Sequence, residues 1–355
     1  MKELIKKTII KITAISLLLV VFGCSSESAT EKPLPVSVIF DTDMGNDVDD
    51  ALALLMFYNY EDMGKCKLLC IAHNKDNPQS VVATNIIEER YGRSHKFCAI
   101  ASGTGKSHDD GWYLKELCQK KTKEGKFFFE RDYSKINSTG ESVATLRKIL
   151  SESPDKSVVY VSVGFLSNLS NLLKSQGDSV SHLSGKELFA KKVKYVSAMV
   201  GNFRPKALAN PAKSFNEFNA ATDAKATGYF LDNCPVPVYF SGVEFGGSIR
   251  YPRSEIDNFF GKDSPIYEAY NTCSLKHHKK DGKFDWASFD MTSVLFVFEP
   301  ELFDLSEAGT VSLFDAEGRI KFVPSKDGKH RYFTEKSKKE EIRKRLIDLA
   351  RVKRK

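Results

Sequence analysis

Residues 36–50 read VSVIFDTDMGNDVDD, an apolar run followed at once by five aspartates. The apolar run predicts a buried β-strand, so the aspartates lie where that strand leaves its sheet. In α/β proteins, the residues that bind ligands gather at the carboxyl ends of the strands. Five like charges this close repel one another, and we therefore expect a hard divalent cation among them.

Apolar strand-like runs alternate with longer helix-like stretches along the chain. The strand-like runs cover 36–40, 67–72, 157–163, 193–200 and 236–241, and the helix-like stretches cover 49–58, 80–91, 166–174 and 222–231. Strands separated by helices of this length form right-handed βαβ units. The sequence therefore predicts an α/β fold with a doubly wound, mostly parallel sheet and helices on both faces. Loop-rich insertions are expected at 103–140, 203–216 and 245–287.

The first 23 residues have the pattern of a secretory signal, because lysines precede an apolar stretch, 14–22, that is too short for a permanent membrane span. The stretch ends in Val-Phe-Gly-Cys24, which resembles a bacterial lipoprotein cleavage box and implies that Cys24 becomes lipidated. An ordinary signal peptide with a chance cysteine is the alternative. We expect export and lipid anchoring to the bacterial cell envelope, at the outer membrane. Residues 24–35 would then be a tether and 36–355 a single domain.

Positive charge is concentrated at the ends of the chain, whose formal net charge is +7. Residues 335–355 are rich in Lys and Arg, and Ile342, Leu346 and Leu349 recur there at helical spacing. This pattern predicts a docked amphipathic helix with a solvated basic side. We expect no nucleic-acid partner and no membrane contact beyond the lipid anchor. The six cysteines after Cys24 match no metal-binding spacing, and their pairing stays open, as does homo-oligomerisation.

The segment from Asp41 to Leu52, D-T-D-x-G-x-D-x-D-D-A-L, resembles the N-terminal metal motif of the inosine/uridine-preferring nucleoside hydrolases, in a variant two residues longer. Haloacid dehalogenase phosphatases also place D-x-D after their first strand, but they carry Thr or Val where this chain has Gly45. A magnesium-dependent phosphatase with Asp41 as its nucleophile is therefore the weaker reading. Four later segments resemble the hydrolase family in the family's order, which implies its Rossmann-like fold.

Two of these segments supply most of the sugar contacts that the resemblance implies. His73-Asn-Lys-Asp-Asn77-Pro is similar to the second active-site loop, with Asn77 at the position that approaches the sugar. Asn216-Glu217-Phe218-Asn219 is similar to the sugar clamp, in which Glu217 and Asn219 bind hydroxyls. An upstream clamp asparagine has no match at the family's spacing, and Asn210 is the nearest candidate. The resemblance also implies that Asp49 holds a sugar hydroxyl.

The resemblance further implies a calcium ion, Ca2+, held by oxygen ligands. The ligands would be Asp43, Asp50, Asp290 and the main-chain carbonyl of Val163. Asp43 would also act as the catalytic general base toward a calcium-activated water. Asp41 and Asp47 are expected to shape the loop or to support the ligands from behind.

The chain departs from the family's pattern at a residue that matters for the leaving group. The family's histidine before Asp290 is replaced by Phe289. Help for the departing base must then come from aromatic stacking, for which Trp112 and Tyr113 are candidates, from His73 or His108, or from a leaving group that needs little help. These options stay open.

The resemblance implies a hydrolase of the N-glycosidic bond of a small-molecule ribonucleoside, for which we expect a purine nucleoside. The alternative is an exported nucleoside- or sugar-binding lipoprotein without turnover.

Overall fold

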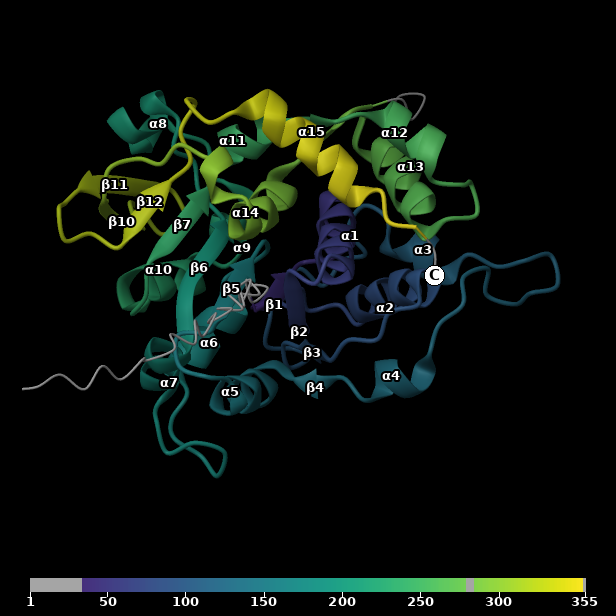
Figure 1. The fold of residues 1–355 in the computed structure, drawn as a ribbon, viewed down its shortest axis with the longest axis horizontal. Helices are drawn as coiled ribbons and strands as arrows, with labels where there is room; N and C mark the ends of the chain where they lie inside the picture. Colours follow the sequence, from purple (N-terminus) through teal and green to yellow (C-terminus); the bar gives the residue numbers. More distant parts are fainter. Residues whose placement is uncertain (1–33, 279–283, 354–355) are drawn as a thin grey trace, which may run out of the picture. The chain divides into compact units, whose positions relative to one another are not determined.

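The aspartate-rich stretch follows the central strand of a large sheet. The computed structural model describes residues 34–278 and 284–353, so the predictions for the signal peptide and Cys24 lie outside the described residues, as does most of the tether. The strands of this sheet are β1 (Val36–Thr42), β2 (Cys66–His73), β3 (Phe97–Ala99), β4 (Gly140–Glu141), β5 (Val158–Ser162), β6 (Val193–Met199), β7 (Val238–Ser241), β10 (Gly309–Leu313), β11 (Ile320–Pro324) and β12 (His330–Tyr332). Their order is β11-β10-β12-β7-β6-β5-β1-β2-β3-β4 (Figure 1).

Most neighbouring strands in this sheet are parallel, and only β10 runs antiparallel to its neighbours β11 and β12. β1 lies between β5 and β2, with Asp41 in register with Ser162 on one side and Ala72 on the other. The carboxyl ends of these three strands therefore meet at one edge of the sheet. The predicted doubly wound, mostly parallel α/β fold is confirmed.

Helices cover both faces of the sheet. The first face carries α1 (Asp49–Asp62), α2 (Gln79–Tyr91), α14 (Phe289–Phe298) and α15 (Lys339–Ala350), and the second carries α5 (Ser142–Glu152), α6 (Ser167–Lys174), α7 (Gly185–Lys192) and α10 (Ala224–Asn233). Along β1, Val38 and Phe40 belong to the core of the first face and Ile39 to that of the second. Alternate residues of a strand point to opposite faces, which explains why this strand is apolar throughout.

Further helices and two short strands complete the described chain. They are α3 (Leu114–Gln119), α4 (Tyr133–Asn137), α8 (Pro205–Ala209), η1 (Pro211–Lys213), α9 (Phe218–Thr222), α11 (Val243–Ser248), β8 (Arg250–Tyr251), α12 (Arg253–Phe259), α13 (Pro265–His278), β9 (Trp286–Ala287) and η2 (Pro300–Leu302). The prediction of a loop-rich segment at 245–287 is wrong in part, because α12 and α13 occupy much of it. The strands β10, β11 and β12 were not predicted.

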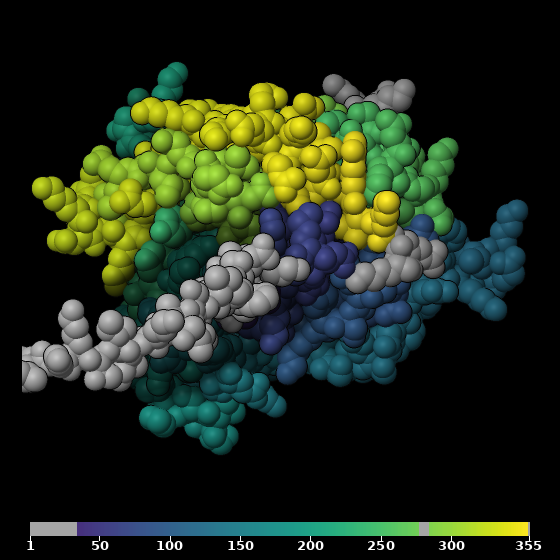
Figure 2. All heavy atoms as spheres, in the orientation of Figure 1, coloured from purple at the N-terminus to yellow at the C-terminus, as the bar shows by residue number. Residues whose placement is uncertain are grey.

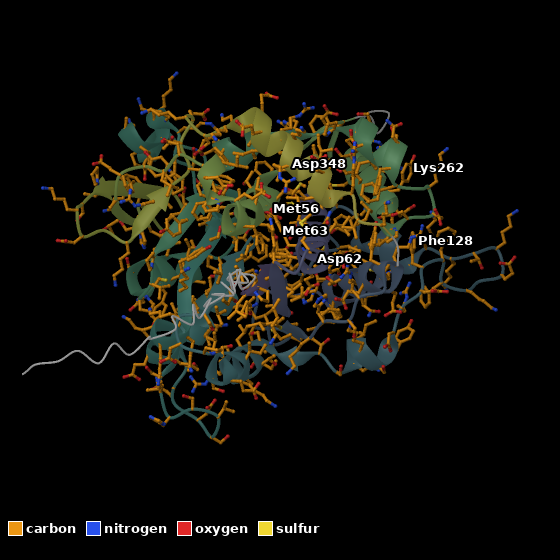
Figure 3. The ribbon with its side chains drawn as sticks, in the orientation of Figure 1. Met56, Asp62, Met63, Phe128, Lys262 and Asp348 are labelled. Atoms are coloured by element: carbon orange, nitrogen blue, oxygen red, sulfur yellow. The ribbon has the colours of Figure 1, made fainter. Side chains whose placement is uncertain are left out.

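The C-terminal amphipathic helix is confirmed as α15. Its residues Ile342, Leu346 and Leu349 are buried, and the helix packs on α1 and α14. Figure 2 shows α15 in yellow along the surface, and Figure 3 labels Asp348 on α15 and Met56 on α1, two helices that pack against each other. Within the described residues, no helix combines the length and apolar character needed to cross a membrane. The six cysteines after Cys24 are free thiols.

A charged group also joins the first two helices. His95 lies between Glu61 of α1, whose Oε2 is 3.0 Å from Nε2, and Glu88 of α2, whose Oε1 contacts Nδ1. Burial disfavours the charged ring, but the two carboxylates outweigh burial and raise the pKa of His95 to about 9.

His95 should make the stability of the fold pH-dependent. Because its folded-state pKa lies above the ordinary value of 6.5, the contribution is complete below pH 6.5 and is lost as the pH rises through about 9. Urea unfolding should show that His95→Gln lowers the free energy of unfolding by roughly 1–3 kcal/mol at about pH 6 and by much less at about pH 10. His182→Gln, at an exposed position, is the control. An equal loss at both pH values would contradict this reading.

Candidate functional site

A cavity of about 570 Å³ opens at the carboxyl ends of the central strands. We call it the acidic cavity, because its lining includes six carboxylates. Four stretches of chain that are distant in sequence meet around it: the loop after β1, the loop before α3, the segment before α9 and the start of α14. Its lining residues are Asp43, Asn46, Asp47, Asp50, Asp109, Gly111, Trp112, Val163, Met199, Phe215, Asn216, Glu217, Phe218, Asn219, Val243, Phe289 and Asp290.

Three buried carboxylates at this cavity form a group that could hold a metal ion. One oxygen each from Asp49, Asp50 and Asp290 lies within 4.8 Å of the others. Asp49 and Asp50 begin α1, and Asp290 lies in the first turn of α14. The buried atoms Asp49 Oδ1 and Asp50 Oδ2 have no hydrogen-bond partner. Buried carboxylate oxygens without a donor are costly unless they bind a cation, so this donor set fits a hard divalent ion such as calcium.

The charge of the acidic cavity gives a second reason to expect a cation. Burial, together with the neighbouring carboxylates, holds the pKa values of Asp49, Asp50 and Asp290 well above their usual range. Burial likewise raises the pKa of Asp43 to about 6 and that of Glu217 to about 7. A divalent ion would offset both the lost hydration and the repulsion.

The residues predicted as metal ligands meet at this cavity, whereas Asp49 lies elsewhere than its predicted role as a sugar contact requires. Asp43, Asp50, Asp290 and Val163 all line the acidic cavity. Asp49, predicted as a sugar contact, is absent from the lining. Its Oδ2 accepts a hydrogen bond from the Asp290 amide at 2.8 Å, and its buried Oδ1 has no hydrogen-bond partner. The structure thus places Asp49 beside the metal donors and behind the cavity wall.

Asp41 is fully buried behind the cavity and belongs to a hydrogen-bond network. Its carboxylate accepts from the Tyr160 hydroxyl at 2.7 Å and from the amides of Asn74 and Asn168, both at 2.9 Å. Since Asp41 does not line the cavity, the phosphatase reading loses its nucleophile. Asn74 in turn accepts from the Phe165 amide, so one network ties β1, β2 and the loop after β5 together.

Asn77 supports the cavity wall from outside. Its amide nitrogen donates to the main-chain oxygens of His108 at 3.1 Å and of Asp109 at 2.9 Å, and it does not itself line the cavity. Asn77 lies outside the cavity lining of this structure, and its predicted contact with the sugar stays a prediction. What Asn77 holds is the loop that carries Asp109, Gly111 and Trp112 into the lining.

Neither histidine proposed to assist the leaving group reaches the cavity. His73 is fully buried, and its ring nitrogens form hydrogen bonds with the main-chain oxygen of Cys98 and the hydroxyl of Thr84. Burial lowers the pKa of His73 to about 4. His108 is largely exposed and contacts Asp76. The two aromatic candidates differ, because Trp112 lines the cavity whereas Tyr113 is buried beneath it.

Glu217 and Asn219, the residues of the predicted sugar clamp, both line the acidic cavity, and their contact with a sugar stays a prediction. Glu217 accepts hydrogen bonds from the amides of Gly201 and Asn219, at 2.9 and 2.8 Å. Asn219 donates to the main-chain oxygens of Val163 and Met199, both at 3.0 Å, which leaves its Oδ1 for a ligand. Asn210 is exposed between α8 and η1 and does not line the cavity, so the structure does not bring it to the clamp.

Several lining residues were not predicted to line the cavity. Asp47, expected to shape the loop or to support the ligands from behind, lies in the lining, where burial and the charges of Asp43 and Glu217 raise its pKa to about 7. Phe215 and Phe218 flank the clamp and are 52% and 56% exposed. Two aromatic residues next to Asn216-Glu217 are the sequence feature from which their position in the lining could have been predicted.

Comparisons with known proteins agree with this geometry. A sequence model described as "Inosine-uridine preferring nucleoside hydrolase" matches residues 38–343. A search of curated proteins gives no significant match.

Solved structures share the fold over nearly their whole length. An inosine-guanosine nucleoside hydrolase has a TM-score of 0.66 at 18% identity, covering 89% of this chain and 99% of its own. A purine-preferring ribonucleoside hydrolase from Gardnerella vaginalis has a TM-score of 0.65 at 16% identity, covering 89% and 100%. An inosine-uridine preferring nucleoside hydrolase from Bacillus anthracis has a TM-score of 0.62 at 16% identity, covering 90% and 100%.

Calcium should stabilise the protein more at neutral than at acidic pH. The raised pKa values of Asp43 and Glu217 mean that the metal-free fold loses stability as the pH rises from about 4 to about 7, where these groups must ionise. Calcium binds the ionised groups, so its effect grows over the same range. At about 100 times its Kd it should add roughly 2.7 kcal/mol, seen as a melting temperature several degrees higher.

Asp50→Asn, which removes a donor, should abolish the shift, whereas Asp327→Asn at an exposed position should keep it. A shift that survives in Asp50→Asn would contradict the proposed location of the ion.

Proposed function

The chain belongs to the inosine-uridine preferring nucleoside hydrolase family and is an N-glycosyl hydrolase, and from this premise we propose that it cleaves purine ribonucleosides with calcium as its cofactor. The observation that carries the proposal is the buried carboxylate group of Asp49, Asp50 and Asp290, next to a cavity with a sugar clamp and aromatic walls. Cleavage of an N-glycosidic bond passes through an oxocarbenium-like sugar. The site must therefore hold the ring, deliver water to one side of it and stabilise the departing base on the other.

Calcium would be held by Asp43, Asp50, Asp290 and the Val163 carbonyl, with the free oxygen of Asp49 close by. When bound, the ion supplies a Lewis acid that orients the sugar diol and lowers the pKa of a water molecule.

Asp43 is the group proposed to take the proton from the attacking water. Burial raises the pKa of Asp43 to about 6 in the metal-free protein, and a bound cation would favour its ionised form, which can accept a proton. The Asn46 amide donates to Asp43 Oδ2 at 2.6 Å, and the buried Lys75 ammonium donates to Asn46 Oδ1 at 2.8 Å. This chain of two hydrogen bonds fixes the orientation of the Asp43 carboxylate and leaves Oδ1 free.

Glu217 and Asn219 are proposed to bind hydroxyl groups of the ribose. Backbone amides hold the Glu217 carboxylate in place: Oε2 accepts from Gly201 and Ala220, whereas Oε1 accepts only from Asn219 and can accept a further hydrogen bond from a hydroxyl. Asn219 links the clamp to the metal donors, because it donates to the Val163 carbonyl.

Aromatic side chains are proposed to stabilise the departing base. No histidine occurs in the lining formed by the described residues, whereas Trp112, Phe218 and Phe289 all lie there. A purine offers a larger face for stacking than a pyrimidine, which supports the purine preference. The inosine-guanosine and purine-preferring hydrolases among the structural relatives point the same way.

We also propose export and lipid anchoring at Cys24, on the sequence pattern alone.

Asp43→Asn should lower the rate of ribose release from inosine about 10²–10⁴-fold, because it removes the proposed base. The reaction is followed as reducing sugar in the presence of calcium, with Asp327→Asn as the surface control. Nucleoside binding by calorimetry without any release of sugar from inosine, guanosine or adenosine would instead support the binding-protein alternative.

A further inference from the structure

The turn between β10 and β11 lies against the segment that carries the predicted sugar clamp. Residues 314–319 form this turn, and Asp315 Oδ1 fixes its course by accepting from the amides of Glu317 at 3.0 Å and Arg319 at 3.2 Å. Three consecutive residues at its end, 318–320, each contact a different part of the clamp's surroundings. The turn is therefore part of the frame around the acidic cavity.

Glycines at two positions permit this close approach. Gly318, whose φ is +91°, lies so close to α9 that a Cβ there would be 2.5 Å from the Ala221 Cα. Gly201, whose φ is also +91°, leaves room for the next residue of the turn, since a Cβ there would be 2.6 Å from the Ile320 Cδ1. The Gly201 amide in turn donates to Glu217 of the clamp. The turn is thus in direct contact with the backbone that holds the clamp in place.

Arg319 joins the turn to the residues that precede the clamp. Its Nε donates to Asn216 Oδ1 at 2.9 Å, and its Nη1 donates to the Ala212 carbonyl at 3.0 Å. Asp315 and Glu317 of the same turn pair with the guanidinium, and the Arg319 side chain is only 19% exposed. Because the donors of a guanidinium lie in one plane, an arginine held by its own turn fixes the direction of the groups it binds. Arg319 therefore determines where the Asn216 amide lies.

Asn216 lines the acidic cavity beside Glu217. Its Oδ1 accepts from Arg319, which leaves its Nδ2 group as a donor toward a ligand. Glu217 Oε1 and Asn219 Oδ1, the groups that the clamp offers, can only accept. A sugar hydroxyl both donates and accepts, so a hydroxyl that donates to the clamp still has lone pairs for a donor. The Asn216 amide supplies a donor of this kind from the same lining.

We infer that Arg319 is a positioning residue, which holds Asn216 so that its amide donates a hydrogen bond to the sugar bound in the acidic cavity. Asn216 is then a direct contact of the ligand, and Arg319 acts only through it. The two residues are 103 positions apart in the chain, which explains why no local motif reveals the pair. This inference rests on the proposed function for the presence of a sugar in the acidic cavity.

Calorimetry with ribose tests the inference without turnover. Arg319→Met removes the donors but not the bulk of the side chain, and it should weaken ribose binding to the calcium-loaded protein about 5-fold, as expected for one hydrogen bond. Asn216→Ala should weaken binding by a similar factor. The double variant should lose no more than Asn216→Ala alone, because Arg319 acts through Asn216. Lys321→Met, at an exposed position of the same hairpin and outside the cavity lining, should bind ribose like the unmodified protein.

A purely structural role for Arg319 gives a different result, in which the melting temperature of Arg319→Met falls while its affinity for ribose stays the same. That result overturns the inference, as does an unmodified protein that does not bind ribose. A double variant whose loss is the product of the two single losses overturns it as well. Arg319→Lys keeps a donor and should recover part of the affinity, and it replaces Arg319→Met in the comparison should that variant fail to fold.

Steady-state kinetics with inosine separate this inference from the proposed function. Arg319→Met should raise KM about 5-fold and change kcat by less than about 2-fold, as expected when a contact made equally in the ground and transition states is lost. Hydrolysis of inosine with an unchanged KM in Arg319→Met overturns the inference and leaves the proposed function standing. Binding of ribose that depends on Arg319, without cleavage of any nucleoside, overturns the proposed function and leaves the inference standing.

Discussion

The mutual repulsion of buried carboxylates is the constraint on which the site depends. The first turns of α1 and α14 bring Asp49, Asp50 and Asp290 together inside the protein, where burial raises the pKa of each and nearby carboxylates raise it further. Such an arrangement is unfavourable for a chain that folds alone and favourable for one that folds around a cation. The network behind it, with Asp41 bonded to Tyr160, Asn74 and Asn168, holds the ends of the neighbouring strands together.

Much of the fold could be predicted because its central strands are buried on both faces. A strand such as β1 is apolar throughout, and a run of that kind is visible in the sequence. The edge strand β11 and its neighbour β10 carry mixed polar and apolar residues, since they are partly exposed, and they were missed. The helices α12 and α13 were missed for a related reason: their apolar residues pack against several elements, which blurs the periodic pattern.

The site could be predicted where a residue acts from a strand end and less well where it acts from a loop. Asp43, Asp50, Val163 and Asp290 lie at or near the ends of regular elements, and their meeting follows from topology. Asn77, by contrast, turned out to support a loop from outside, because the course of residues 103–113 decides which way its amide points. Asp47 lines the cavity for the same kind of reason, since the two extra residues of the motif bring it forward.

Val243 and Phe289 line the acidic cavity and also a second cavity, whose lining includes Arg204, Lys206 and Arg250. Only these two residues belong to both linings, and Asp50 and Asp290 belong to the acidic cavity alone. The two neighbouring hollows therefore differ in electrostatic potential, so that an anion in solution is attracted toward one and repelled from the other.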